Sequence, residues 1–432
     1  MLDLDSSIRN WGAARRRWIT FFFVATVVPI ALWIGWHLGD VFQQPDAGYY
    51  MNLAVGKPAM APFASRQLGP LIVRGLMHLS HVSIYRGFMV EGVASLVFFV
   101  GSICFLLVRS GAPRWMMAAA GGLFFWSLQF SELMMPDLFY AALMCCFLLL
   151  LRRQHLLAAA LTMFPLMVSR ESTLLALVCF LAAGWRRLRI HEAVTAVAST
   201  VAGMLVVKHL SANALPNEEQ ISPTLYLFAK LPWNFLKNVL GIEPWANVYP
   251  LSCSVPKWQI ALHVGPLHAI GFCQFLAQGP RECLIYATTT FGLLPLMLIR
   301  LRKVRTTTGG REDMLMRFAV FYGGLCFVMA PVLGAALIRL FGYSWPLFLV
   351  AVPLLLGGTR AAFSSKWAAW LFLAIHLSLS WSFVWLRQNP QQVMVAGVLL
   401  SGCGWFLLRS TWRVEDGAAP ETASAKHPLK VL

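Results

Sequence analysis

An acid, two aromatic residues and a base come together in one polar stretch of an otherwise apolar chain. Asp46 lies on a Pro-Asp turn, Tyr49 and Tyr50 follow it, and Arg66 stands shortly before a Gly-Pro pair. A carboxylate can take the proton of a hydroxyl group, and a guanidinium can hold an anion such as a phosphate. These residue types predict a site in this stretch, although Asp46 taken alone is equally well explained as a turn residue that bonds its own backbone.

Two further turns between apolar runs carry ionisable residues. Glu132 and Asp137 bracket a short turn, and Asp137 follows Pro136, where it would also suit the first turn of a helix. Arg170 and Glu171 are neighbours in the chain, and their simpler role is an internal ion pair. Ionisable residues at membrane depth are costly to place, which makes both pairs candidates for function.

One base in the C-terminal part of the chain completes the candidate set. Arg339 stands shortly before Trp345 and Pro346, where its alternative role is to reach the membrane interface. Glu91 and His376 lie within apolar runs, and we expect both to be structural.

The composition places these residues in a membrane protein. The mean hydropathy is +0.66 and only 12% of the residues are charged, which is more apolar surface than a soluble core needs. The net charge of +17 comes from short Lys and Arg clusters between apolar runs. That pattern is typical of membrane topology rather than of nucleic-acid binding. Because the chain has no GxxxxGK[ST] phosphate loop, we do not expect ATP-driven chemistry.

We predict an all-α fold, a polytopic transmembrane helical bundle with both termini in the cytoplasm. A span needs about 20 apolar residues, and the chain offers about 12 such runs, several of them shorter than this. The basic cluster from Arg15 to Arg17 precedes the first run and places the N-terminus inside. The predicted spans are 18–39, 84–108, 115–130, 138–151, 156–168, 172–185, 191–210, 284–299, 314–337, 341–356, 367–386 and 393–408.

The same pattern divides the chain into three parts. Residues 1–17 are a cytoplasmic tail, residues 18–409 a single transmembrane domain, and residues 410–432 a disordered cytoplasmic tail. Two long outer loops belong to the transmembrane domain, namely 40–83, which carries Asp46, and 211–283. Within the first, residues 68–80 are expected to lie in the interface without crossing. All the candidate residues then fall on the outer side.

Three cysteines share the second outer loop, where an oxidising compartment permits a disulfide. We expect Cys253 to pair with Cys273, which leaves Cys283 as a thiol. Their spacing does not match a zinc site. The chain contains no Asn-x-Ser/Thr sequence, which favours a bacterial cytoplasmic membrane with the site facing the periplasm or exterior.

The motifs resemble those of the C-type (GT-C) membrane glycosyltransferases, best over residues 18–190. The resemblance rests on Asp46-Ala-Gly-Tyr-Tyr followed by a proline-flanked Arg66, on the acidic second outer loop, on Ser-Arg170-Glu171 and on Arg339 before Trp-Pro. It implies a polyprenyl-phosphate-linked sugar donor and a first-loop acid that activates the acceptor hydroxyl. Many members carry two adjacent acids where this chain has a single aspartate, so a divalent metal ion stays an open question.

The chemistry of such a transfer assigns roles to the candidate residues. Cationic side chains must surround the departing phosphate, and the available set is Arg66, Arg170 and Arg339. A carboxylate must accept the proton of the attacking hydroxyl, for which Asp46 is the first choice and Asp137 the second. Glu132 is a further catalytic candidate, and Tyr49, Tyr50 and Glu171 are expected to contact the substrate. The expected partners are the bilayer, the lipid-linked donor and a glycan, lipid or protein acceptor, without nucleic acid.

Two other classes of function fit parts of the pattern. A transporter or flippase for a lipid-linked or anionic solute would use the same arginines along a path. Transporters often show internal repeats with broken helices, and no convincing repeat relates residues 1–210 to 211–432. An assembly protein that binds partners through its outer loop would tolerate replacement of Asp46.

Overall fold

The structure is a computed structural model of the 432-residue chain. It describes residues 21, 25–26, 46–60, 63–109, 113–130, 135–215, 223–247, 253, 255–264, 267–301, 313–334, 336–357, 359–386 and 389–416. The predicted tail 1–17, nearly all of the first predicted span, the candidate Glu132 and residues 417–432 lie outside these ranges.

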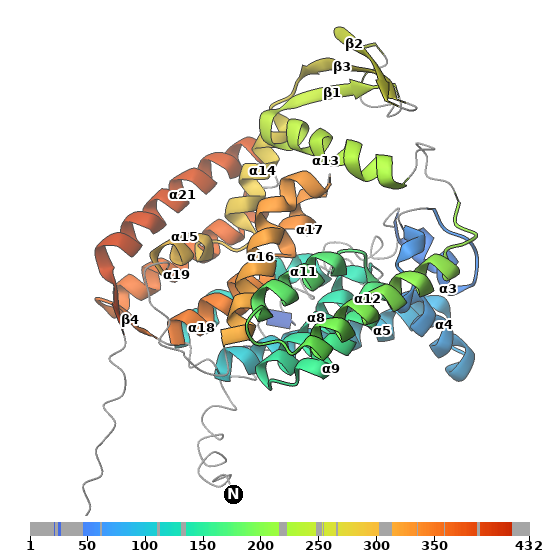
Figure 1. The fold of residues 1–432 in the computed structure, drawn as a ribbon. Coiled ribbons are helices and arrows are strands. Elements are labelled where there is room, and N and C mark those ends of the chain that lie inside the picture. The colour runs from blue at the N-terminus through green and yellow to red at the C-terminus, as the bar shows by residue number, and fades with distance from the viewer. Residues whose placement is uncertain are drawn as a thin grey trace, which may run out of the picture.

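Helices make up most of the described chain (Figure 1). The first half contains α3 (Ala47–Ala54), η1 (Phe63–Ser65), α4 (Leu68–Ser80), α5 (Ile84–Arg109), α6 (Arg114–Gly121), α7 (Phe125–Phe130), α8 (Pro136–Arg152), α9 (Leu156–Leu161), α10 (Met163–Ser169), α11 (Thr173–Gly184) and α12 (Ile190–Leu210). The second half contains α13 (Pro223–Leu240), α14 (Gln278–Thr289), α15 (Leu294–Leu301), α16 (Asp313–Leu333), α17 (Leu337–Gly342), the π-helical η2 (Leu347–Ala351), α18 (Val352–Gly357), α19 (Lys366–Ser380), α20 (Ser382–Trp385) and α21 (Pro390–Thr411).

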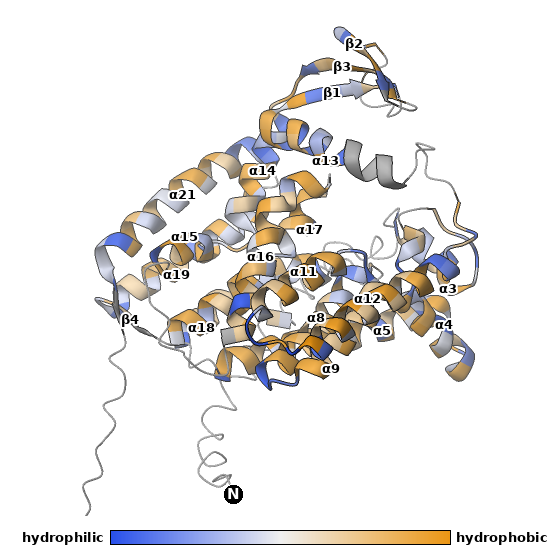
Figure 2. Ribbon diagram, viewed as in Figure 1, coloured by the Kyte–Doolittle hydropathy of each residue, from blue (hydrophilic) through white to orange (hydrophobic). Residues whose placement is uncertain are grey.

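Five helices among the described residues are long and apolar enough to cross a membrane. They are α5, α12, α16, the continuous run from α17 through η2 to α18, and α21. The pair α14 and α15 would add a sixth span, although it bends by 69° at its break. Figure 2 shows how widely apolar residues cover these helices. The chain is therefore a multi-pass membrane protein.

Most predicted spans coincide with helices, but several are interrupted. Predicted spans 84–108, 191–210 and 393–408 correspond to α5, α12 and α21. The run 115–130 divides into α6 and α7, and the run 284–299 divides into α14 and α15. At the second break Gly292 has φ +52°, and a side chain there would collide with His376. The predicted spans 156–168 and 172–185 appear as the two short apolar arms of a helical hairpin, 156–169 and 173–184, separated at Arg170.

Tightly packed aromatic side chains hold the bundle together around α5, α8 and α16. Phe99 of α5 packs against Trp126 and Trp345, with ring centroids 5.4 and 5.0 Å away. Phe147 of α8 lies 4.8 Å from Phe318 of α16. Because lipid is as apolar as these rings, their close packing rather than exclusion from water stabilises the helix contacts. This core fixes the start of α8, which carries Asp137.

Two small sheets correct the all-α prediction. Strands β1 (Ile242–Ala246), β2 (Trp258–Val264) and β3 (Leu267–Phe275) form an antiparallel sheet in the order β1-β3-β2. Together with α13 they make a module at one end of the bundle, within the predicted loop 211–283 (Figure 1). The disulfide Cys253–Cys273 joins the connection between β1 and β2 to β3, and Cys283 is free, as predicted.

The second sheet corrects the predicted disorder of the C-terminal tail. Residues Trp412–Asp416 form β5, which pairs antiparallel with β4 (Thr359–Phe363). The pairing satisfies backbone groups that a disordered tail would leave to water. Because β4 follows α18 and β5 follows α21, these two helices end on the same side of the bundle.

The two ionisable residues expected to be structural are enclosed by the bundle. His376 is fully buried, and its Nδ1 accepts a hydrogen bond of 3.0 Å from the backbone of Leu293. Its Nε2 lies 3.0 Å from the carbonyl oxygen of Ala119. The ring thus connects three segments of the bundle. Glu91 is also buried and accepts a hydrogen bond from Ser95, one helical turn away.

Candidate functional site

Asp137 is the centre of a cluster of charged residues at the start of α8. Pro136 occupies the first turn of this helix and Met135 the N-cap, so Asp137 is not the capping residue. Its carboxylate instead accepts hydrogen bonds from Arg170 and from the hydroxyl of Tyr343. Its other oxygen lies 3.1 Å from Nη2 of Arg339. The side chain is only 10% exposed, so these contacts replace the water that an isolated carboxylate would need.

Arg339 of α17 connects this centre to the first predicted outer loop. Its Nη1 lies 3.7 Å from Oδ2 of Asp46, while its Nη2 pairs with Asp137. Asp46 stands at the N-cap of α3, yet its side chain makes no cap hydrogen bond. The distance to Arg339 is an ion pair without a hydrogen bond. Because the Asp46 side chain is 37% exposed, it is the accessible carboxylate of the two.

The position of Asp46 depends on how α3 is fastened to α4. Arg74 of α4 donates a 3.0 Å hydrogen bond to the carbonyl of Ala54 at the end of α3. A base at a helix C-terminus satisfies carbonyls that have no partner within the helix. Gly56 follows with φ +79°, and a side chain there would press on the Arg74 guanidinium at 3.2 Å. Glycine is therefore required at this turn.

Arg170 approaches Asp137 because the helical hairpin breaks at this residue. Its backbone is extended, with φ −163° and ψ 140°, which ends α10. The carbonyl of Arg170 accepts a 2.8 Å hydrogen bond from the Thr173 hydroxyl, which closes the turn into α11. The guanidinium carbon lies 4.5 Å from the ring centroid of Tyr343. Tyr343 thus contacts both Arg170 and Asp137, through its ring face and its hydroxyl.

A second ion pair lies beside the first. Arg66 donates two hydrogen bonds to the Glu171 carboxylate, at 3.2 and 2.6 Å, in the paired geometry that arginine favours. Its Nη1 donates a third, 2.9 Å long, to the hydroxyl of Tyr50. The backbone of Gln67 donates a 3.0 Å hydrogen bond to the carbonyl of Val168, which holds this loop against the hairpin.

Six charged residues therefore form one neutral group, which we call the charged cluster. It consists of three carboxylates and three guanidiniums: Asp46, Asp137, Glu171, Arg66, Arg170 and Arg339. Burial opposes ionisation of Asp137, but Arg170, Arg339 and Arg66 together hold its pKa below the ordinary value. Burial also opposes ionisation of Glu171, and Arg66 outweighs it, which lowers that pKa to about 2. Both carboxyls are ionised at neutral pH.

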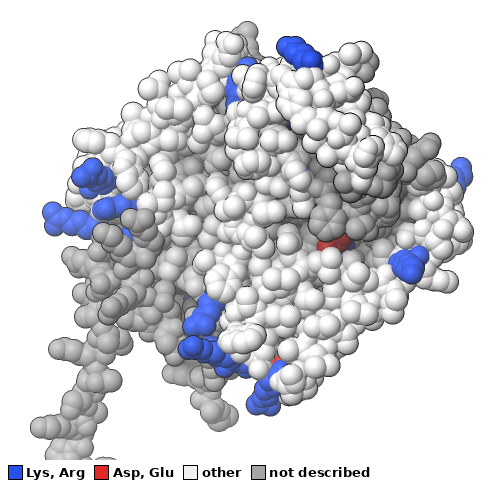
Figure 3. Space-filling model, turned by 45° about the horizontal axis from the view of Figure 1, so that its top comes forward, with Lys and Arg blue, Asp and Glu red and all other residues white. Residues whose placement is uncertain are grey.

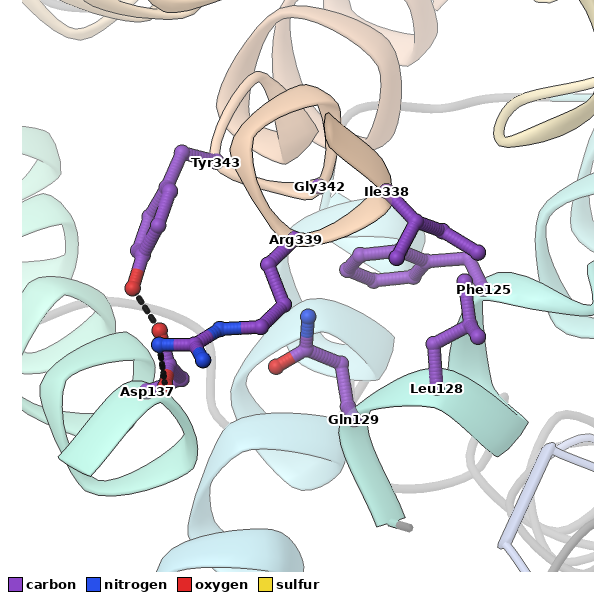
Figure 4. A pocket seen from close by; sticks show the side chains of 8 residues that line it. All are labelled: Phe125, Leu128, Gln129, Asp137, Ile338, Arg339, Gly342 and Tyr343. Atoms are coloured by element: carbon purple, nitrogen blue, oxygen red, sulfur yellow. Dashed lines mark hydrogen bonds and ion pairs between the residues drawn. The ribbon is translucent and has the colours of Figure 1, made fainter. Parts of the chain in front are cut away.

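A small cavity opens onto the cluster between α7, α8 and α17 (Figure 4). Its volume is about 30 Å³, which is the space of a single water molecule. Asp137, Arg339 and Tyr343 line one side, and Gln129 of α7 points into the same space (Figure 4). Figure 3 shows a face with few charged side chains, on which an acidic residue lies at the back of a recess.

The structure brings most of the predicted site residues together, in differing roles. Tyr50 is fully buried against Arg66, so it supports the cluster and does not face a substrate. Tyr49 is half-buried and stacks on Phe63, with centroids 4.5 Å apart. In the part of the chain that the structure describes, no three His, Cys, Asp or Glu residues are grouped as metal ligands would be. Because the described carboxylates of the site are paired with arginines, these residues do not fit a divalent ion, and no chemical step is assigned to one.

Tyr343 is a member of the site that the sequence analysis did not select. It follows Arg339 by four residues, a spacing that puts both side chains on the same face of a helix. That spacing is the signal that could have identified it. Gln129 carries no comparable signal, because an amide within an apolar run has several structural roles.

Three comparisons with known proteins gave no match: no family model, no curated protein and no solved structure is similar to this chain.

Proposed function

We propose that this protein is an integral membrane glycosyltransferase that moves a sugar from a polyprenyl-phosphate donor to an acceptor hydroxyl. The observation that supports it most directly is the pairing of two carboxylates of different exposure with one arginine. Asp46 is accessible, Asp137 is enclosed, and Arg339 contacts both. A sugar transfer needs a base and a cation at one place, and this arrangement supplies them together.

The difference in exposure between the Asp46 and Asp137 side chains favours Asp46 as the base. Asp137 is surrounded by Arg170, Arg339 and Tyr343, and the cavity of about 30 Å³ beside it is too small for a sugar or other acceptor. Asp46 has one ion pair at 3.7 Å and is open to an approaching group. Its carboxylate would take the proton from the hydroxyl while the hydroxyl oxygen bonds to the anomeric carbon. The bond from that carbon to the phosphate oxygen breaks, polyprenyl phosphate leaves, and the anomeric centre inverts.

Binding of the donor would itself prepare the base. The pair between Asp46 and Arg339 is long and partly exposed, and such pairs contribute about 0–1 kcal/mol. A hydrogen bond from arginine to a charged oxygen contributes about 1.5–3 kcal/mol. A donor phosphate would therefore displace Asp46 from Arg339 and leave its carboxylate ready to accept a proton. Arg66 and Arg170 are themselves buried, and their pairs with Glu171 and Asp137 hold the cluster in shape.

The proposal includes a topology of about 12 spans with both termini in the cytoplasm. It also requires that the prenyl chain of the donor enters the site from the bilayer. The site then faces the periplasm or exterior of a bacterial cytoplasmic membrane. The opposite arrangement of the two sheets agrees with that orientation: the module with the disulfide lies at one end of the bundle and β4 at the other (Figure 1). Disulfides form in oxidising compartments.

The bent pair of α14 and α15 favours a second candidate, a transporter of a lipid-linked or anionic solute. Broken helices are common at transporter binding sites near the bilayer midplane. Here, however, the break is occupied by His376, which bonds Leu293 and contacts no charged residue of the cluster. Transport without transfer of the sugar is the outcome that would favour this candidate.

Proteoliposomes with a radiolabelled polyprenyl-phosphate sugar test the proposal. Asp46→Asn removes the base and keeps the shape, so transfer should fall by about 10²–10⁴-fold, while donor binding persists. Glu282→Gln, a half-buried acid on α14 hydrogen-bonded to Gln278, is the matched control and should transfer normally. If Asp46→Asn transfers as well as wild type, or if wild type moves the donor across the bilayer without consuming it, the transferase proposal fails.

A further inference from the structure

The module formed by α13 and the first sheet contains a cavity that the proposed function does not use. It encloses about 630 Å³ between the helix and the sheet, which lies within the ~300–1,000 Å³ typical of small-molecule sites. Trp233 of α13, Trp245 of β1, Trp258 of β2 and Phe272 of β3 line it. We call it the apolar pocket.

The lining decides which chemistry the apolar pocket can accept. All the residues that line it are Pro, Trp, Leu, Ile, Ala, Gly or Phe. A sugar in such a space would lose its hydrogen bonds to water and gain few in exchange, which disfavours its binding. Glu243 of β1 is buried nearby, but it bonds Gln274 at 2.8 Å and is absent from the lining. The pocket therefore suits a hydrocarbon, which is stabilised when its apolar surface leaves water.

The module lies where the membrane-crossing helices end. Asn234 and Asn238 of α13 donate hydrogen bonds of 3.0 and 2.8 Å to carbonyls of Val332 and Pro331 at the end of α16. On the other side, β3 ends only a few residues before α14 begins. Figure 1 shows α13 between the sheet and the bundle. The pocket is thus at the level where hydrocarbon meets water.

The rim of the pocket is apolar and exposed. Phe275 is 73% exposed and Trp258 is 54% exposed, and both belong to the lining. Large apolar side chains left open at this level are typical of contact with lipid, and Trp is enriched at membrane interfaces. These two side chains give the opening of the pocket an apolar edge.

We propose that the apolar pocket binds one acyl chain of a bilayer phospholipid and so holds the module against the membrane. Phospholipid acyl chains are the most abundant hydrocarbon at this level, and the side chains that line the pocket carry no polar group besides the indole N–H of the tryptophans. The inference does not depend on sugar transfer, because the pocket and the charged cluster share no residue.

A photoreactive phospholipid tests this site in the full chain. The probe carries a diazirine near the end of one acyl chain and is reconstituted with the protein in vesicles. After illumination, mass spectrometry should locate labelled peptides in residues 232–247 and 267–275. Ala246→Phe fills the pocket from β1, and labelling there should fall about tenfold, equivalent to ~1.4 kcal/mol of lost binding. Ala261→Phe, an exposed position of β2 outside the lining, is the matched control.

Each outcome separates the alternatives. Strong labelling of the module in wild type and in Ala261→Phe, with loss in Ala246→Phe, supports the proposal. Labels confined to the bundle helices overturn it, whatever the folding of the variants. If unlabelled polyprenyl phosphate displaces the probe but excess phospholipid does not, the occupant is a prenyl chain and the assignment to an acyl chain is wrong.

Discussion

The charged cluster is assembled from segments that lie far apart in the chain, whereas the apolar pocket is built from one continuous stretch between residues 232 and 275. The cluster needs the packing of α3, α8, the hairpin and α17 before its charges meet. The pocket needs only its own sheet, α13 and a disulfide. The two regions should also differ in their tolerance to substitution. Removing one buried charge leaves its partners without a counter-charge, while the apolar side chains around a pocket can repack.

From this difference we predict that, of the substitutions proposed here, Asp137→Asn lowers the stability of the protein most. It leaves Arg170 and Arg339 in a buried place without their shared carboxylate. Breaking a buried pair in this way costs about 3–5 kcal/mol, so the thermal midpoint in detergent should fall clearly and sugar transfer should be lost.

Glu91→Gln is the control for that experiment. Glu91 is buried like Asp137, but the hydrogen bond that the structure records for its carboxylate comes from Ser95 of the same helix. Its replacement should leave the midpoint nearly unchanged. Equal losses in the two variants would show that burial, rather than the arginine network, determines the cost.

The sequence predicts the local features of both regions and misses those that depend on distant packing. Long apolar runs place α5, α12 and α21, and Cys253 and Cys273 are paired as predicted. The sheet was missed because its strands lie in a stretch that was interpreted as a polar loop. In addition, β1 pairs directly with β3, although β2 lies between them in the sequence. Strand pairing of this kind depends on tertiary context more than on propensity.

For the charged cluster, the sequence supplies the residues but not the partners. Asp137 was named as a candidate, yet nothing in the order of the chain links it to Arg170 and Arg339. That link depends on how α8 packs between other helices. By contrast, the break at Gly292 was within reach, because a glycine in an apolar run marks a possible turn.

The disulfide gives a second test of the separation between the two regions. Cys253→Ser opens the bond to Cys273 in the central strand, and loss of such a bond costs about 2–4 kcal/mol. Hydrogen exchange should rise in β2 and β3, while α8 and α16 keep their protection. Cys403→Ser, a free exposed cysteine of α21, is the control. Faster exchange throughout the bundle would mean that the module and the charged cluster are one cooperative unit.

Acid should destabilise the charged cluster, by less than Asp137→Asn or Cys253→Ser destabilises the protein, and should leave the apolar pocket intact. Arg66 lowers the pKa of Glu171 from 4.5 to about 2, against the opposing effect of burial. Since the folded state has the lower pKa, the pair stabilises the protein fully above pH 4.5, and this contribution is lost as the pH falls toward 2. The difference in thermal midpoint between wild type and Glu171→Gln should therefore be constant at higher pH and close within that interval. By pH 2 most of the ion pair's contribution to stability should be lost, because the unfolded state is fully protonated and Glu171 is about half protonated in the folded state. A difference that persists unchanged at pH 2 would therefore mean that Glu171 acts through packing, and the contrast between a charged and an apolar region would lose its electrostatic basis.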